Sequence, residues 1–233
     1  MTCQGLAIRR LVLASGSPRR RQLLSLLGLP FVIQAADVSE EQHDDELPEQ
    51  MVLRVARAKA QAVDSARADE LVIAADTTVA LDGKSLGKPK DAADAVRMLR
   101  VLRGRPHVVY TGVVIWHAAA RRLVCELGKS SILMRDYADS EVDRYVQSGD
   151  PLDKAGAYAI QHPIFDPVAT VQGCWLNVMG MPICHTVRAL TTAGLPAPAA
   201  HVPASCCAFT QRACSAWPEI LAGLYPRDHS GSG

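Results

Sequence analysis

The chain has 233 residues, of which 48% are hydrophobic and 21% are charged, and its formal net charge is +1. This composition is typical of a globular protein, and a charge near zero excludes a global field that would attract nucleic acid. Apolar stretches are too short to span a bilayer and the N-terminal segment does not read as a signal peptide, so we expect a cytoplasmic protein without a membrane partner.

The first informative segment, residues 11–21, reads LVLASGSPRRR. Its apolar half predicts a buried strand. Ser17 followed by Pro18 predicts the N-cap and first residue of a helix that Gly28 ends. Cations in a first turn oppose the helix dipole, whereas free N–H groups beside arginine forks can bind phosphate. Two interpretations stay open at this point, a phosphate site or a solvated basic turn that caps a core helix.

The rest of the chain alternates predicted strands and helices, which favours an α/β fold. Pro48 begins a helix after an acidic loop over 37–49, and an apolar strand over 71–75 ends at Asp76. An Asp82-Gly83 pair predicts a hairpin turn. The other expected elements, in chain order, are a strand over 31–33, a helix over 91–102, a strand over 107–116, a helix over 140–149, a loop running into a strand over 155–160 and a helix over 185–193.

The composition shifts to Ala, Pro, Cys and Ser from about residue 195. We therefore expect one folded domain over 1–197 and a C-terminal tail over 198–233 that is partly disordered. The seven cysteines are odd in number and scattered, which does not predict a disulfide framework. A metal site in the tail is conceivable, although the spacing of its candidate ligands matches no zinc pattern: Cys206, Cys207, Cys214 and His201.

Polar side chains of opposite charge follow several of the apolar runs. Asp76 comes after an apolar strand, where open α/β sheets place their ligands, although an aspartate that starts a turn is also common. Glu40 belongs to the acidic loop, which alone is more typical of a solvated face. Each lysine alone is typical of a surface residue. Together the segments offer cations for an anionic ligand and carboxylates for a divalent cation: Arg19, Arg20, Lys59, Lys88 and Lys154, with Glu40 and Asp76.

The order of these motifs resembles that of the Maf family of nucleotide pyrophosphatases, also called septum-formation-inhibitor-like proteins. The resemblance covers about residues 9–195 and is carried by LASGSPRR, the loop glutamate, RVARAKA, AADTTV, GKP, HVVYTGV and DKAGAYAIQ. It implies a fold similar to that of inosine triphosphate pyrophosphatases, with an elongated mixed β-sheet flanked by helices and two lobes around a deep cleft. It also implies hydrolysis of a nucleoside triphosphate to the monophosphate and pyrophosphate, a Mg²⁺ or Mn²⁺ cofactor and a homodimer.

The resemblance assigns roles to individual residues. Asp76 resembles the family's catalytic carboxylate, and Glu40 and Asp76 resemble its metal ligands. The basic residues would stabilise the leaving pyrophosphate while Asp76 orients or deprotonates a metal-assisted water that attacks the α-phosphorus. The substrate contacts implied are Ser15, Arg19, Arg20, Lys59, Thr77, Lys88, Lys154 and Gln161.

The motifs SPRR and DKAGAYAIQ resemble the branch of the family that acts on dTTP and UTP, and modified pyrimidine analogues fit the same expectation. A neutral amide at Gln161 suits a pyrimidine edge because it donates and accepts at once. The alternative substrate is 7-methyl-GTP, whose branch usually has glutamate there. His162 stands where the family usually has glycine. Rivals from other classes are a catalytically silent nucleotide-binding regulator of cell division and a nucleic-acid-binding protein that uses the Arg19–Arg21 run, which the near-zero charge disfavours.

Overall fold

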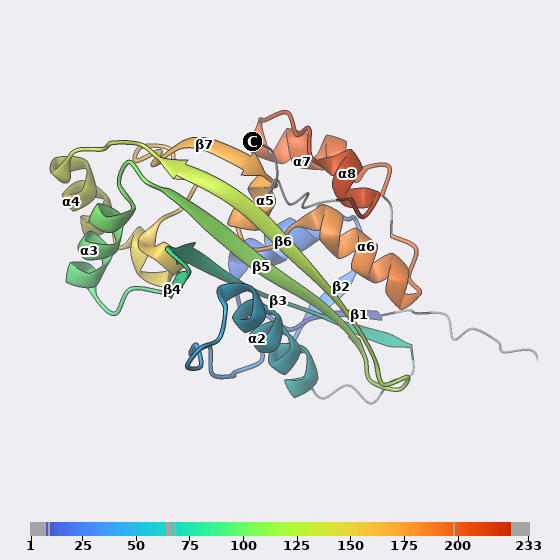
Figure 1. The fold of residues 1–233 in the computed structure, drawn as a ribbon. Coiled ribbons are helices and arrows are strands. Elements are labelled where there is room, and N and C mark those ends of the chain that lie inside the picture. The colour runs from blue at the N-terminus through green and yellow to red at the C-terminus, as the bar shows by residue number, and fades with distance from the viewer. Residues whose placement is uncertain (1–7, 9, 64–66, 68, 198, 225–233) are drawn as a thin grey trace, which may run out of the picture.

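The computed structural model describes residues 8, 10–63, 67, 69–197 and 199–224. Its frame is one mixed sheet of seven strands in the order β2-β1-β3-β5-β6-β7, with β4 paired to β3 outside that path (Figure 1). β1 is parallel to both of its neighbours, β2 and β3, whereas the pairs β3–β5, β5–β6 and β6–β7 are antiparallel. The strands are β1 (Arg10–Leu13), β2 (Phe31–Ile33), β3 (Glu70–Leu81), β4 (Lys84–Leu86), β5 (Pro106–His117), β6 (Arg122–Met134) and β7 (Val168–Gly173).

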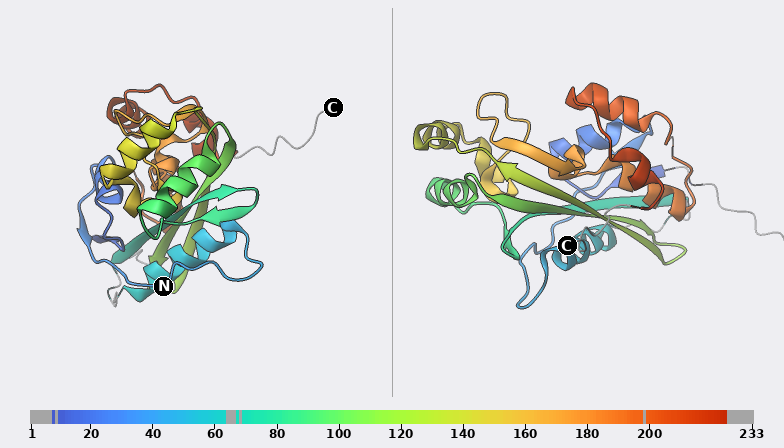
Figure 2. Two further views of the ribbon diagram at one scale, coloured as in Figure 1. Left: turned by 90° about the vertical axis from the view of Figure 1, so that its left-hand side faces the viewer. Right: turned by 45° about the horizontal axis from the view of Figure 1, so that its top comes forward.

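Helices cover both faces of this sheet. α2 lies alone on one face, and α6, α7 and α8 lie on the other, as the right-hand view of Figure 2 shows. α3 and α4 pack together at one end of the long strands (Figure 1). The helices are α1 (Pro18–Ser25), α2 (Pro48–Ala62), α3 (Ala92–Leu102), α4 (Asp139–Gln147), α5 (Trp175–Val178), α6 (Ile183–Ala193), α7 (Val202–Thr210) and α8 (Trp217–Leu221), with 3-10 helices η1 (Asp150–Asp153) and η2 (Ala155–Ala157).

Strand β3 is apolar on both sides because it separates two cores. Alternate residues of a strand point to opposite faces of the sheet. Ile73 and Ala75 are buried in the larger core, and Val72 and Ala74 are buried in the smaller core against α2. The helix approaches so closely that a Cβ at Gly112 of β5 would lie 2.7 Å from a backbone oxygen of α2. Only glycine fits at that position, so the sheet can hold α2 directly over β3 and β5.

Local sequence signals for the element ends are confirmed. The Ser17 side chain accepts a hydrogen bond from the backbone N–H of Arg20 and so caps α1. Asp91 caps α3 in the same way. Asp82 and Gly83 have φ angles of 51° and 77°, which is the pair of positive values that a two-residue hairpin turn between β3 and β4 requires.

Two sequence expectations about strands are wrong, and the strands β6 and β7 were not expected. β3 does not end at Asp76 but continues to Leu81, because β5 pairs with it along almost its whole length. The segment 155–160 does not run into a strand, since positive φ angles at Gly156 and Ala157 turn the chain. β6, which is 13 residues long, was not among the expected strands. Its Gly-Lys-Ser-Ser centre has low strand propensity, and pairing with β5 overrides that preference.

The C-terminal segment contains α7 and α8, which pack against the body of the protein. Val202, Cys206 and Ile220 are buried in the larger core. The Arg188 guanidinium of α6 donates to the Ile220 carbonyl oxygen at 2.8 Å. The terminal sequence DHSGSG lies outside the described residues. In the part of the chain that is described, none of the helices combines the length and apolar character needed to cross a membrane.

Two buried histidines give the fold a pH dependence. Burial lowers the pKa of His107 and of His185 from 6.5 to about 4. Between pH 6.5 and 4 the unfolded chain therefore binds protons at these histidines that the folded chain does not. Their neutral burial lowers stability progressively as the pH falls from 6.5 towards 4, and it has no such effect above pH 6.5. We expect the free energy of unfolding to fall by a few kcal/mol over this range. In urea denaturation, His107→Gln should show a smaller fall, and an identical fall would contradict a neutral buried imidazole.

Candidate active site

A cleft opens where β1 ends and β3 continues. β1 pairs with β3 only as far as Leu13 and Ile73. Between Ile73 and Val79, where β4 joins, no strand of the described chain pairs with β3 on that side. Side chains from both faces of β3 can therefore reach one open edge. The cleft has a volume of about 670 Å³, and its walls come from the β1–α1 turn, the acidic loop, α2, β3, the η1–η2 region and the end of α5.

All the site residues expected from the sequence line this cleft. Segments that are far apart in the chain supply them, and cations and carboxylates are paired on the same walls of the cleft. Asp76 is not at the end of its strand, but it lies where the parallel neighbour of β3 has ended, so its side chain reaches the cleft. The set is Ser15, Arg19, Arg20, Glu40, Lys59, Asp76, Thr77, Lys88, Lys154 and Gln161.

A buried lysine joins two carboxylates in the cleft. Lys59 lies in the last turn of α2, and its Nζ is 2.7 Å from Asp76 Oδ1 and 2.5 Å from Glu40 Oε1. Lys59 is 5% exposed and Asp76 is 4% exposed, so this pair is removed from water. Asp76 faces α2 because it has the parity of Val72 and Ala74 along β3. The sheet and the helix thus force the three charged groups together.

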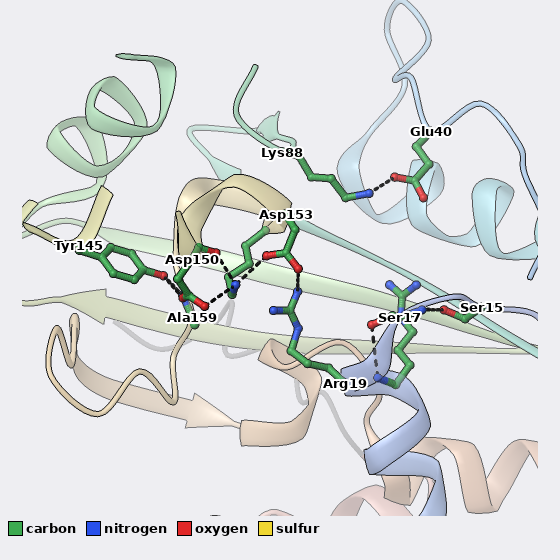
Figure 3. A network of polar contacts seen from close by, with 11 residues as sticks. Ser15, Ser17, Arg19, Glu40, Lys88, Tyr145, Asp150, Asp153 and Ala159 are labelled. Carbon is green, nitrogen blue, oxygen red and sulfur yellow. Dashed lines mark hydrogen bonds and ion pairs between the residues drawn. The ribbon is translucent and has the colours of Figure 1, made fainter. Parts of the chain in front are cut away.

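The two carboxylates differ in basicity. Burial raises the pKa of Asp76, although the charges of Lys59 and Arg20 oppose that shift. Burial also acts to raise the pKa of Glu40, but hydrogen bonds from Lys59 and Lys88 outweigh it and hold the pKa at about 2. The Lys88 Nζ atom lies 3.0 Å from Glu40 Oε2 (Figure 3). Asp76 is therefore the better proton acceptor of the two, and Glu40 stays ionised.

The opposite face of β3 carries a second cation to the cleft. The Arg20 guanidinium donates to the Gly180 carbonyl at 3.0 Å and to Thr77 Oγ1 at 3.3 Å. Thr77 Oγ1 lies 3.0 Å from Thr111 Oγ1, and Thr111 donates to the Asn177 carbonyl. Burial lowers the pKa of Arg20, yet a guanidinium remains charged in proteins. Hydrogen bonds to Gly180 and Thr77 thus fix the plane of a partly buried cation beside the open edge of β3.

Two further cations of the cleft, Arg19 of α1 and Lys154, are already paired with aspartates of η1 (Figure 3). Lys154 is 7% exposed, and its ammonium group donates to the Asp150 side chain at 2.9 Å, to Asp153 at 2.6 Å and to the Asp150 carbonyl. Arg19 lies 3.6 Å from Asp153 Oδ2. Asp150 also accepts from the Tyr145 hydroxyl at 2.7 Å. An anionic ligand must compete with these two aspartates for Lys154 and Arg19.

Sequence reasoning missed Arg54, which holds the acidic loop in place. Its guanidinium bonds both carboxylate oxygens of Glu46 at 2.6 and 2.8 Å, and it donates to the Glu41 carbonyl at 2.7 Å. These hydrogen bonds hold the pKa of Glu46 at about 2. Glu41 follows Glu40, so the contact fixes the backbone next to the carboxylate. The arginine in RVARAKA that precedes Lys59 by five residues was the available signal.

The donor set suits a hard divalent cation that is bound together with a ligand. Glu40 and Asp76 supply carboxylate oxygens to one cleft, and Mg²⁺ is usually held by one or two carboxylates together with substrate phosphates. Within the described residues, the tail cysteines included, no group of three or more His, Cys, Asp or Glu side chains is placed to hold a metal ion. A cation in the cleft would therefore need oxygen atoms from the ligand or from water.

The fold and the cleft define a class of protein, a mixed α/β protein whose cation-lined cleft and paired carboxylates suit a polyanionic ligand. The family model described as "Maf-like protein" matches residues 10–193. The chain therefore belongs to the Maf family, and the resemblance seen in its motifs is confirmed. The mixed sheet flanked by helices is confirmed as well. The segment that carries α7 and α8 lies beyond the matched residues.

Three similar relatives are each named dTTP/UTP pyrophosphatase. The relative from Myxococcus xanthus is 48% identical over 188 residues, which is 81% of this chain and 94% of that protein. Those from Thermomicrobium roseum and Anaeromyxobacter dehalogenans are 46% and 48% identical, and cover 80% and 81% of this chain and 85% and 96% of their own. Among solved structures, the Ham1 protein of Staphylococcus aureus has a TM-score of 0.40 at 17% identity, over 55% of this chain and 73% of its own.

Proposed function

We propose that this protein hydrolyses nucleoside triphosphates, dTTP and UTP foremost, to the monophosphate and pyrophosphate. The observation that carries the proposal is the Glu40–Lys59–Asp76 array in a cleft whose walls hold further cations. The two carboxylates of the array can orient a water molecule and bind a divalent cation. The basic side chains of the cleft can bind a triphosphate. In support, the relatives with 46–48% identity are named dTTP/UTP pyrophosphatase. Modified pyrimidine triphosphates belong to the same proposal.

We propose that Asp76 orients and deprotonates the attacking water. Lys59 holds one oxygen of the carboxylate, which orients the other towards the cleft, and burial makes the carboxylate more basic than usual by raising its pKa. Asp76 can then orient a water molecule and accept its proton. Glu40 and Asp76 would together hold a divalent cation, Mg²⁺ or Mn²⁺. Such a cation supplies neutralisation of phosphate charge and a lowered pKa for a bound water.

The basic side chains bind the triphosphate and stabilise the leaving pyrophosphate. Arg20 is held rigidly by Gly180 and Thr77, so it offers a fixed guanidinium. Lys88 is 56% exposed at its side chain and can move from Glu40 to a phosphate. Arg19 and Lys154 contact phosphate by exchanging their aspartate partners for it. The Ser15 side chain accepts from a backbone N–H at 3.2 Å and keeps the turn before α1 open to the ligand.

A substrate panel in ¹⁸O-labelled water tests this proposal. The protein is incubated with dTTP, UTP, CTP, GTP and 7-methyl-GTP, each with Mg²⁺ and with Mn²⁺. We expect pyrophosphate from dTTP and UTP with the label in the monophosphate, because water attacks the α-phosphorus. Label in the other product, or release of inorganic phosphate, contradicts that chemistry. Turnover of 7-methyl-GTP alone assigns the other substrate class, and nucleotide binding without any pyrophosphate favours a silent regulator.

Arg54 provides a separate test of the acidic loop. We expect Arg54→Gln to lower kcat/KM for dTTP about 10–100-fold, the range typical of residues that orient metal ligands, because Glu40 loses its fixed backbone. Raising the Mg²⁺ concentration should restore part of this loss. The matched control is Arg57→Gln, an exposed position of the same helix. Equal effects of the two substitutions would mean that the loop is not positioned through Arg54.

A further inference from the structure

A second cavity adjoins the cleft at the end where Gln161 lies. Its volume is about 470 Å³, within the range of small-molecule sites. α5 connects the two cavities, since Trp175 at its start lines the second cavity and Val178 at its end lines the cleft. Four residues line both: Arg19, Ile160, Gln161 and Met179. A ligand in the cleft therefore has a neighbouring space to extend into.

The C-terminal segment forms part of the wall of this second cavity. Phe209 and Thr210 at the end of α7, and Arg212 just after it, line the cavity. The Arg212 guanidinium carbon lies 4.0 Å from the centroid of the Trp175 ring, which is cation–π distance. Buried side chains of α7 anchor it in the larger core. These wall residues lie outside the residues 10–193 that match the family.

The two cavities offer different chemistry. The lysines of the site line the cleft, together with the carboxylates that face them. The second cavity has aromatic rings, Trp175 and Phe209, and neutral hydrogen-bonding groups, among them Gln22 and Thr210. Its charged side chains are Arg19, Asp166 and Arg212. A triphosphate is drawn to the lysines, and a flat heteroaromatic ring is suited to aromatic and guanidinium planes.

We propose that the second cavity receives the nucleobase end of the substrate and that the C-terminal segment sets base preference there. This rests on the proposed function, because it assumes that the cleft holds the phosphates. The Arg212–Trp175 stack supplies a flat platform for a pyrimidine ring or a substituent on it, and Phe209 closes one side. Gln161, on the shared wall, is placed to read the edge of the base.

Substitutions in the full chain separate the base from the phosphates. Arg212→Ala and Phe209→Leu are compared with Arg57→Ala, which removes an exposed arginine of α2 outside the described linings of both cavities. The probes are dTTP, UTP and inorganic triphosphate, which has no base and is measured as an inhibitor. We expect both wall substitutions to raise KM for dTTP and UTP about 5–30-fold, as loss of a stacking or cation–π contact predicts, with kcat little changed. The inhibition constant of inorganic triphosphate should stay unchanged.

An unchanged KM for both nucleotides overturns the proposal, and so does an equal weakening of inorganic triphosphate. Quenching of Trp175 fluorescence by dTTP gives a readout independent of turnover, and Trp175→Phe identifies that signal. If the unsubstituted protein releases no pyrophosphate but dTTP quenches Trp175 and Arg212→Ala weakens the quenching, the second site stands and the hydrolase proposal fails. If pyrophosphate is released and neither wall substitution changes KM or quenching, the hydrolase proposal stands and the second site fails.

Discussion

Replacing Asp76 with asparagine should leave the protein folded and lower the rate of pyrophosphate release about 10²–10⁴-fold, the scale of a positioned base. Asparagine has nearly the same shape but cannot accept the proton of the attacking water. Lys59 keeps Glu40 as an ionic partner in this variant, at 2.5 Å in the unsubstituted chain, so no unpaired buried charge is created. Steady-state pyrophosphate release from dTTP, with thermal unfolding measured beside it, checks the result.

The matched control for this substitution is Asp82→Asn. Asp82 lies in the turn that ends β3, its side chain is 72% exposed, and asparagine tolerates its positive φ. We expect normal turnover from this variant. Undiminished release by Asp76→Asn would remove Asp76 from the mechanism. A loss of folding in Asp76→Asn would show that the main role of the carboxylate is to stabilise the fold.

Lys59→Met should have the largest effect on stability. The substitution leaves Asp76, which is 4% exposed, with a buried negative charge and without its ammonium partner. Removing one member of a buried ion pair typically costs about 3–5 kcal/mol, and we expect the free energy of unfolding to fall by that amount. Pyrophosphate release should also be lost, because the Asp76 carboxylate is no longer oriented. Urea denaturation and the same turnover assay measure both effects.

A double-mutant cycle assigns the cost to the pair. Lys59→Met/Asp76→Asn removes both charges, so it should regain part of the lost stability while remaining inactive. Lys84→Met, at an exposed position of β4, is the control for loss of a lysine alone. If the stability costs of Lys59→Met and Asp76→Asn simply add, the two side chains are not energetically coupled. The Glu40–Lys59–Asp76 array would then not be what stabilises this part of the cleft.

Much of the site could be predicted because its residues follow elements that local sequence defines. The Ser-Pro cap placed the arginines at the start of α1, and the apolar run of β3 pointed to Asp76 as the polar residue that follows it. The contacts between them could not be predicted. Lys59 and Asp76 are 17 residues apart, and their 2.7 Å contact depends on Gly112 letting α2 lie directly on the sheet.

Some features had a local signal that the motif did not resolve, and others had none. Asp150 and Asp153 precede Lys154 by four residues and by one, so these pairs are local, but the sequence does not show that η1 directs both carboxylates at the ammonium group. The second cavity needs Trp175 and Arg212 to meet, although they come from α5 and from the segment after α7. Such contacts depend on helix packing against a common core, which short-range patterns do not encode.

The sequence by itself determined the α/β class, the caps and the hairpin turn, because these depend on interactions within a few residues and on hydrophobic periodicity. It also determined the types of charge available to the site. Only the tertiary structure decided which charges are paired, which carboxylate is more basic, and that the C-terminal segment borders a second cavity. Pairing and pKa depend on distance and burial, and both arise only when segments far apart in the chain exclude water together.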